Sequence, residues 1–222
     1  METPMTDHIA RKDYDLVYEP SEDTFLLLDA LEEDLPVLEK HKPLICLEIG
    51  SGSGIIIAAL SKKLNSSFCI ATDINRHACK ISKQTAKHNS SSLEVVNMDL
   101  AKAFKANLFD IIIFNPPYVP TMQEEEANRC FEDRNKNDQD LSTNGNLFWS
   151  WAGGLHGRVV IDKFINELDR LLAPNGILYL LVIKDNKPDE IISNMSVKGF
   201  KAIKFMDRKI RGEHLIILKV TY

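Results

Sequence analysis

The sequence lacks the features of membrane-spanning, disulfide-bonded and metal-binding proteins. It contains no apolar run of the roughly 20 residues that a transmembrane helix needs, and no C-x-x-C spacing of the kind that binds zinc. Its start also lacks the basic and apolar segments of a secretory leader. We therefore expect a chain without membrane attachment and without a bound metal, in the cytosol or the nucleus.

Cysteine is scarce, with four residues in 222: Cys46, Cys69, Cys79 and Cys130. Three of them lie in apolar segments or in a predicted helix. This placement favours buried thiols in a reducing compartment over a disulfide framework.

An excess of basic charge is also missing. The 27 Lys and Arg residues against 32 Asp and Glu give a net charge of −5, so the chain as a whole has no electrostatic attraction for nucleic acid. The stretch 198–211 does gather basic side chains, namely Lys201, Lys204, Arg208, Lys209 and Arg211. We interpret it as the solvated face of a hairpin, and a docking patch for RNA or an acidic partner is the less favoured alternative.

The composition is that of a globular protein, with 44% hydrophobic and 27% charged residues. Short apolar runs alternate with helical patterns, which is typical of a parallel sheet covered by helices. The predicted strands are 44–49, 68–72, 93–97, 109–114 and 177–183, followed by a hairpin of 201–206 and 214–220. Residues 1–222 are therefore predicted to form one α/β domain, with a seven-stranded, doubly wound, Rossmann-like sheet and a C-terminal antiparallel hairpin.

Capping signals place several helices between these strands. Ser21 is the expected N-cap of the first helix, with Glu22 and Asp23 favourably placed in its first turn. Another helix is expected from about Arg158, and Pro174-Asn175-Gly176 is expected to close it.

Two segments carry no predicted helix or strand. The opening dozen residues look irregular. Residues 121–146 are polar and charged and have little to bury, so they are predicted to form a mobile insertion over the functional site, with order returning at Phe148.

A glycine-rich turn follows the first predicted strand. Glu48 interrupts the apolar run near its carboxyl end, and Gly50, Gly52 and Gly54 come next. Glycine lets the backbone turn tightly and approach a ligand at this edge of an open sheet. Because the spacing is G-x-G-x-G and not the G-x-G-x-x-G of dinucleotide sites, S-adenosylmethionine is favoured over a nicotinamide dinucleotide.

Acidic residues end the next two strands. Asp73 lies about 20 residues after the glycine turn, where a carboxylate accepts hydrogen bonds from ribose hydroxyls. Asp99 follows the third strand and is placed to accept from an exocyclic adenine amine, with Leu100 against the ring; alone it would be an ordinary turn residue. Together with the glycine turn, these residues predict a nucleoside-containing cofactor.

The fourth predicted strand ends in the loop Asn115-Pro116-Pro117-Tyr118. The two prolines fix two backbone φ angles and have no N–H, so the loop presents acceptors on a rigid frame. The side-chain oxygen of Asn115 and the carbonyl of Pro116 can each accept one hydrogen from an –NH2 group, and Tyr118 offers an aromatic face to a planar group. Taken alone, the loop could equally be an ordinary strand-ending turn.

The chain contains five recognisable motifs: Tyr18–Thr24, Glu48–Gly54, Thr72–Asn75, Asn115–Val119 and Trp151–Gly154. Together they resemble the HemK family of class I methyltransferases, and the resemblance covers nearly the whole chain outside the first dozen residues and the middle insertion. It is strongest to the short eukaryotic branch, which methylates a glutamine side chain in the class-1 peptide release factor.

The resemblance implies roles for individual positions. Asn115, Pro116, Pro117 and Tyr118 would form the catalytic loop that holds the glutamine of a Gly-Gly-Gln motif, as in a protein-(glutamine-N5) methyltransferase. The positions implied to line the S-adenosylmethionine site are Thr24, Glu48, Gly50, Asp73, Asp99, Leu100 and Asn115.

The resemblance also implies a partner. Eukaryotic relatives pair with a small zinc-binding activator protein that adds to the edge of the third strand. Leu93, Val95 and Val96 are therefore the expected contacts of a heterodimer.

Other functions stay open on sequence grounds. The same loop serves amino-adenine methyltransferases of DNA, whose target base is flipped out, although the acidic balance here does not supply the basic surface that they need. Methylation of a histone lysine is a second alternative, and a non-catalytic scaffold that binds a partner is a third.

Overall fold

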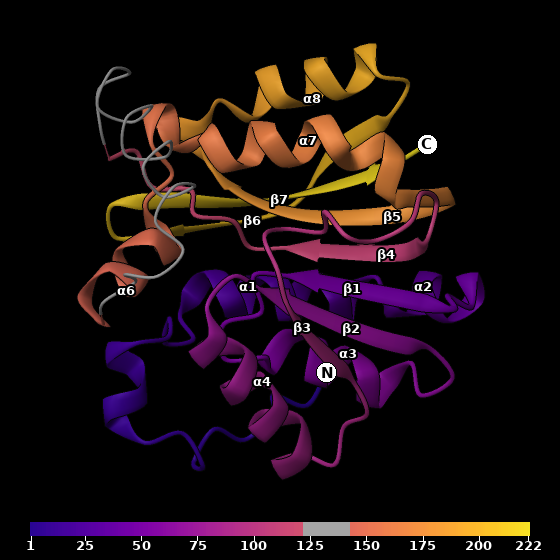
Figure 1. The fold of residues 1–222 in the computed structure, drawn as a ribbon. Coiled ribbons are helices and arrows are strands. Elements are labelled where there is room, and N and C mark those ends of the chain that lie inside the picture. The colour runs from indigo at the N-terminus through magenta and orange to yellow at the C-terminus, as the bar shows by residue number, and fades with distance from the viewer. Residues whose placement is uncertain (122–142) are drawn as a thin grey trace.

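The computed structural model describes residues 1–121 and 143–222, and within this part of the chain seven strands form one sheet. The strands are β1 (Ile45–Ile49), β2 (Phe68–Asp73), β3 (Glu94–Asn97), β4 (Phe109–Phe114), β5 (Leu172–Ile183), β6 (Lys201–Ile210) and β7 (Glu213–Thr221). Their order is β3-β2-β1-β4-β5-β7-β6 (Figure 1). β1 to β5 are parallel, and β7 is antiparallel to both β5 and β6. The predicted α/β sheet with its C-terminal antiparallel hairpin is confirmed.

Helices cover both faces of this sheet. They are α1 (Glu22–Glu33), α2 (Leu35–His41), α3 (Ile55–Lys63), α4 (Arg76–His88), α6 (Thr143–Trp151), α7 (Val159–Leu171) and α8 (Pro188–Val197), with short 3-10 helices η1 (Arg11–Asp15), η2 (Leu155–Gly157) and η3 (Lys184–Asn186). α3 packs against both α1 and α4, and α7 and α8 lie together in a second layer (Figure 1). Right-handed crossovers require two layers, because the chain moves outward in one direction from β1 to β3 and in the other from β4 to β5.

The apolar runs of β4 and β5 are buried because helices cover them on both sides. Phe114, the last residue of β4, packs edge-on against Phe164 of α7 with 5.0 Å between the ring centroids. This contact fixes the carboxyl end of β4, where Asn115 follows. The strand that delivers the predicted loop is thus anchored in the core.

The helix expected to close at Pro174-Asn175-Gly176 is α7, which ends at Leu171, just before that segment, as predicted. The segment itself was not expected to belong to a strand. It lies within β5, as an excursion between Leu172, which pairs with Phe109, and Ile177, which pairs with Ile111. Proline has no N–H to give to a sheet ladder, so the strand bulges there and resumes its pairing afterwards.

The first part of the chain holds more structure than expected. The opening residues, predicted to be irregular, include η1, and Ile9 and Val17 form a small buried cluster with Ala78 and Ile81 of α4. α2 was not predicted at all, although Pro36 stands in its first turn, where proline is tolerated. Hydrophobic contact with α4 orders the opening segment, and its own sequence does not show that contact.

Most of the predicted insertion 121–146 lies outside the described residues. At its first edge, the Thr121 N–H donates to the carbonyl of Gly154 at 3.3 Å. At its far edge, α6 begins at Thr143, earlier than Phe148, where order was expected to return.

Two other predictions can be compared with the described residues. Cys46, Cys69 and Cys79 are buried free thiols, as expected, while Cys130 lies outside the described part of the chain. In the basic stretch, Lys204 pairs with Asp189 at 2.7 Å and Arg208 pairs with Glu22 and Asp29, which favours a solvated, ion-paired face. No helix among the described residues is long and apolar enough to cross a membrane.

Candidate active site

A pocket opens at the carboxyl ends of β1, β2 and β4, where the strand order reverses between β1 and β4. Ligands bind at such switch points in open α/β sheets. Every site residue predicted from the sequence lines this pocket: Thr24, Glu48, Gly50, Asp73, Asp99, Leu100, Asn115, Pro116, Pro117 and Tyr118. The tertiary structure thus brings together positions from five segments of the chain.

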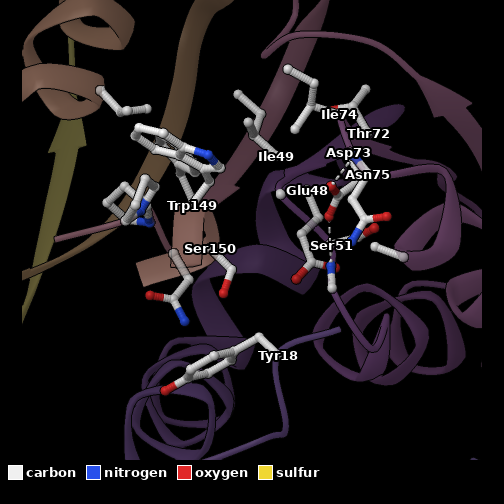
Figure 2. A pocket seen from close by; sticks show the side chains of 18 of the residues that line it. Tyr18, Glu48, Ile49, Ser51, Thr72, Asp73, Ile74, Asn75, Trp149 and Ser150 are labelled. Carbon is white, nitrogen blue, oxygen red and sulfur yellow. Dashed lines mark hydrogen bonds between the residues drawn. The ribbon is translucent and has the colours of Figure 1, made fainter. Parts of the chain in front are cut away.

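Trp149 and Ser150 of α6 line the same pocket, across from Asp73 and Asn75 (Figure 2). Sequence reasoning assigned neither of them a role. The indole of Trp149 adds an aromatic surface to a pocket that Tyr18, Phe114, Tyr118 and Trp151 also line.

The glycine turn is held by hydrogen bonds within the chain. Its Ser51 N–H donates to the carbonyl of Thr72 at 3.0 Å. Gly54 has a φ of +76°, and a Cβ there would lie 2.7 Å from the Cα of Ser82, so only glycine fits. At Gly52, by contrast, a Cβ would meet nothing within 4 Å, which leaves the backbone open toward the pocket.

Asp73 and Glu48 each brace this turn. The two carboxylate oxygens of Asp73 accept from the N–H groups of Gly52, at 3.0 Å, and Asn75, at 2.8 Å. Glu48 is buried, and its Oε2 accepts from the Ile57 N–H in the first turn of α3 at 3.0 Å. Burial raises the pKa of Glu48 well above its usual value despite that bond. Asp73 thus holds two N–H groups of the turn at the end of β2, where a carboxylate can also meet a ribose hydroxyl.

Asp99 lies at the pocket wall with two basic neighbours. Its Oδ2 pairs with Lys102 at 2.5 Å and with Lys163 of α7 at 2.9 Å. Burial acts to raise the pKa of Asp99, but the two lysines outweigh it and the pKa lies below its usual value. Leu100 follows with a φ of +52°, an uncommon conformation for leucine, and lines the same wall.

The Asn115 loop is organised by Asp23, a residue of the first turn of α1. Asp23 is 3% exposed, and its Oδ2 accepts from Asn115 Nδ2 at 3.0 Å and from the Tyr118 hydroxyl at 3.2 Å. Because a carboxylate only accepts, the amide nitrogen of Asn115 must be the atom that faces it. Burial, and then the charge of Asp23, raise the pKa of Tyr118, so its phenol stays protonated as a donor. Sequence reasoning had assigned Asp23 only a favourable place in a helix turn.

This orientation leaves Asn115 Oδ1 as an acceptor without a partner. Among the described residues, three buried side-chain polar atoms have no hydrogen bond, and two of them, Asn115 Oδ1 and Thr72 Oγ1, belong to pocket-lining residues. Buried polar groups are normally satisfied, because an unpaired one is costly. Unpaired atoms in this pocket therefore indicate that a polar ligand completes it.

The Trp151–Gly154 motif and η2 support the back of the Asn115 loop. Val119 N–H donates to the carbonyl of Trp151 at 3.0 Å, and Gly153 N–H donates to the carbonyl of Val119 at 2.8 Å. A Cβ on Gly157 would lie 1.8 Å from the carbonyl oxygen of Tyr118. The motif, for which the residue pattern indicated no role of its own, is thus the packing surface of the loop.

Comparison with known proteins identifies the family to which this chain belongs. Residues 22–171 match the family described as the methyltransferase small domain. The chain belongs to this methyltransferase family. Over 99% of its length this methyltransferase is 38% identical to Methyltransferase HEMK2 of Homo sapiens, covering 96% of that protein. It is 33% identical to the eRF1 methyltransferase catalytic subunit mtq2 of Schizosaccharomyces pombe, over 99% of this chain and 95% of that one.

A solved structure shares the fold. The chain in the Mtq2–Trm112 complex of E. cuniculi, described as responsible for methylation of the eRF1 translation termination factor, has a TM-score of 0.66 and 29% identity to this methyltransferase. The match covers 92% of this chain and 98% of that one. The resemblance inferred from the five motifs is confirmed.

Methyltransferases of this family take their methyl group from S-adenosylmethionine, and the pocket fits that cofactor. The open space at Gly52 suits its amino-acid part, and the position of Asp73 at the end of β2 suits its ribose. The unpaired Asn115 Oδ1 lies beyond them, at the end of β4, and suits a group that donates hydrogen bonds.

Proposed function

We propose that this methyltransferase methylates the side-chain amide nitrogen of the glutamine in the Gly-Gly-Gln motif of the eukaryotic class-1 peptide release factor. The observation that carries the proposal is the unpaired acceptor Asn115 Oδ1, held in place by Asp23. The names of the relatives in Schizosaccharomyces pombe and E. cuniculi point to the same substrate class.

A carboxamide suits this pocket because its –NH2 group has two hydrogens to donate. Asn115 Oδ1 accepts one, and the carbonyl of Pro116 accepts the other, since both prolines of the loop lack an N–H that would compete. The planar amide packs against Tyr118. S-adenosylmethionine supplies, when bound, an electrophilic methyl group on a sulfonium.

The protein's contribution is to orient a weak nucleophile. An amide nitrogen shares its lone pair with the carbonyl, so a fixed position toward the methyl donor contributes more than removal of a proton. Asp23 is a positioning residue in this scheme, because it acts through Asn115 and Tyr118. We assign the other predicted positions to the cofactor: Thr24, Glu48, Gly50, Asp73, Asp99 and Leu100.

We also propose a small zinc-binding activator as a partner on the edge of β3. This strand is at one end of the sheet. Val96 within it and Leu93 just before it are only partly buried, whereas Val95 is buried, with 8% of its surface exposed. An exposed sheet edge is a template for another strand. The buried free thiols suit a reducing compartment, and we place the enzyme in the cytosol or nucleus.

The partner contact can be tested with a matched pair of variants. Val96→Lys on β3 is expected to weaken co-purification with the activator. Ile203→Lys on β6, the strand at the opposite end of the sheet, introduces the same charge at a residue that is 45% exposed and is expected to have no effect. Equal loss, or no loss, for both variants contradicts the β3 assignment.

The activity test is mass spectrometry of folded release factor after incubation with enzyme, activator and S-adenosylmethionine. One added methyl group on the glutamine of Gly-Gly-Gln is expected, and none on a factor carrying Gly-Gly-Ala. Methyl transfer to the amino group of DNA adenine or to a histone lysine instead, under the same conditions, would replace the glutamine assignment. An absence of transfer to all three would favour a binding scaffold.

A further inference from the structure

Two histidines and an aspartate meet where the opening segment of the chain crosses the end of α4, outside the pocket. One ligand atom from each of Asp7, His8 and His88 lies within 4.8 Å of the ligand atoms of the other two. The imidazole rings of His8 and His88 face each other, with centroids 4.7 Å apart and planes inclined by 30°. His88 Nε2 lies 2.9 Å from Asp7 Oδ1.

The hydrogen bonds of Thr85 determine which nitrogen of His8 carries its proton. The hydroxyl of Thr85 donates its single hydrogen to the carbonyl of Ser53 at 2.7 Å, so toward His8 it can only accept. It lies 3.0 Å from His8 Nε2, which is therefore the N–H donor. A neutral ring with its hydrogen on Nε2 has its lone pair on Nδ1.

That lone pair has no partner. His8 Nδ1 is the third of the three buried side-chain polar atoms without a hydrogen bond in the described part of the chain. The other two belong to the cofactor pocket, where a ligand completes them. An unsatisfied buried nitrogen beside a second imidazole and a carboxylate points in the same way to a ligand. Because the free position is a lone pair, the ligand must accept an electron pair, as a metal cation does.

We propose that Asp7, His8 and His88 bind a divalent transition-metal ion of the zinc type. Imidazole and carboxylate are ligands of Zn²⁺, and a ligating histidine usually donates its other N–H to a neighbouring acceptor, as His8 does to Thr85. None of the three described cysteines, which were not expected to bind a metal, belongs to this cluster.

The geometry requires only a small contraction. Zn–N and Zn–O bonds of about 2.0–2.2 Å place tetrahedral ligand atoms roughly 3.4 Å apart. Asp7 and His88 are exposed, so their side chains can rotate toward His8, which Thr85 holds in place. The outer side of the site is open to solvent, and a water molecule completes the coordination.

A metal ion bound here would link the opening segment, through Asp7 and His8, to the end of α4, through His88. The same segment is already bound there by Asn89, whose side chain accepts from Met5 N–H at 2.7 Å and donates to Met5 C=O at 2.9 Å. Further along, the carbonyl of Leu16 accepts from Asn75 at 2.7 Å, and Tyr18 then enters the pocket. The ion therefore stabilises the segment that leads into the active site.

The test uses the full chain without an affinity tag and Zn²⁺ alone as the probe. Calorimetric titration is expected to give one saturable site, and a hundredfold excess over Kd is expected to raise Tm by about 5 °C. Co²⁺ substituted at the site is expected to show ligand-field bands without the charge-transfer absorption of a thiolate.

Three variants make the assignment specific. His88→Gln and Asp7→Asn change exposed residues and are expected to weaken Zn²⁺ binding by at least about tenfold with unchanged circular dichroism. His214→Gln is the matched control, because His214 pairs with Asp207 at 2.6 Å but has no second imidazole, and it is expected to bind as the parent does. No saturable binding to the parent chain, or equal binding to His88→Gln, overturns the proposal.

Discussion

The two sides of the pocket are built in different ways. On the cofactor side, which comprises the glycine turn with Glu48 and Asp73, polar groups bond to backbone near in sequence: 9 positions separate Glu48 from Ile57 and 21 separate Gly52 from Asp73. On the acceptor side, which comprises Asn115 to Tyr118 with Asp23, the central bond joins residues 92 positions apart. The cofactor side is mostly satisfied by its own chain, and the acceptor side keeps an open hydrogen-bond position.

This difference separates binding from chemistry. Changes on the acceptor side should lower turnover and leave cofactor affinity nearly intact, because the acceptor side holds the substrate amide. Changes on the cofactor side should do the reverse. Each variant below is therefore measured twice, by calorimetric titration with S-adenosylmethionine and by a methyl-transfer assay.

Asn115→Ala is expected to have the largest effect. It removes an acceptor that orients the amide and should lower turnover by about 1,000-fold. Cofactor affinity should change by less than about tenfold, because the cofactor side keeps its own hydrogen bonds. Retained turnover would contradict the role of the loop.

Asp23→Ala is expected to lower turnover by about 100-fold through misplacement of Asn115. Asp23→Asn keeps one accepting oxygen and should recover part of that loss. Glu22→Gln is the control, because Glu22 lies next in sequence but pairs with the surface residue Arg208. A loss in cofactor affinity equal to the loss in turnover would show that Asp23 acts on the whole pocket and not through Asn115.

Asp73→Asn is expected to weaken S-adenosylmethionine binding by about 30-fold, the effect of losing a hydrogen bond to a charged group. Turnover at saturating cofactor should fall much less. The variant also loses an acceptor for the N–H of Gly52 or Asn75, so circular dichroism should accompany the titration. Unchanged affinity would remove Asp73 from the cofactor site.

A pair of glycine variants should show the smallest and most informative difference. Gly157→Ala pushes against the carbonyl of Tyr118 and should lower turnover by about tenfold. Gly54→Ala pushes against Ser82 behind the glycine turn and should weaken cofactor binding by about tenfold. Both glycines have positive φ, so the strain from the backbone conformation is similar. The steric clash is greater at Gly157, where the Cβ would lie 1.8 Å from a backbone oxygen, than at Gly54, where the nearest atom is 2.7 Å away. The same response from both variants would end the distinction between the two sides.

The residues of the cofactor side could be predicted from the sequence alone. Strand, glycine turn and acidic strand end are local patterns, and parallel strands necessarily bring their carboxyl ends to one edge. The seven strands, Glu48, Gly50 and Asp73 could therefore be placed without coordinates. So could Asn115 and Tyr118, because the prolines between them define a rigid loop at the end of a buried strand.

Only the tertiary structure decided how the acceptor side works. Nothing local distinguishes Asp23 from any acidic residue in a first helical turn, and its link to Asn115 exists only once α1 packs against the sheet. The contact of Gly157 with Tyr118 and that of His8 with His88 could not be predicted either, because each joins segments that are far apart in the sequence. Local hydrogen bonds follow from the order of residues, whereas contacts between distant segments depend on how the layers pack.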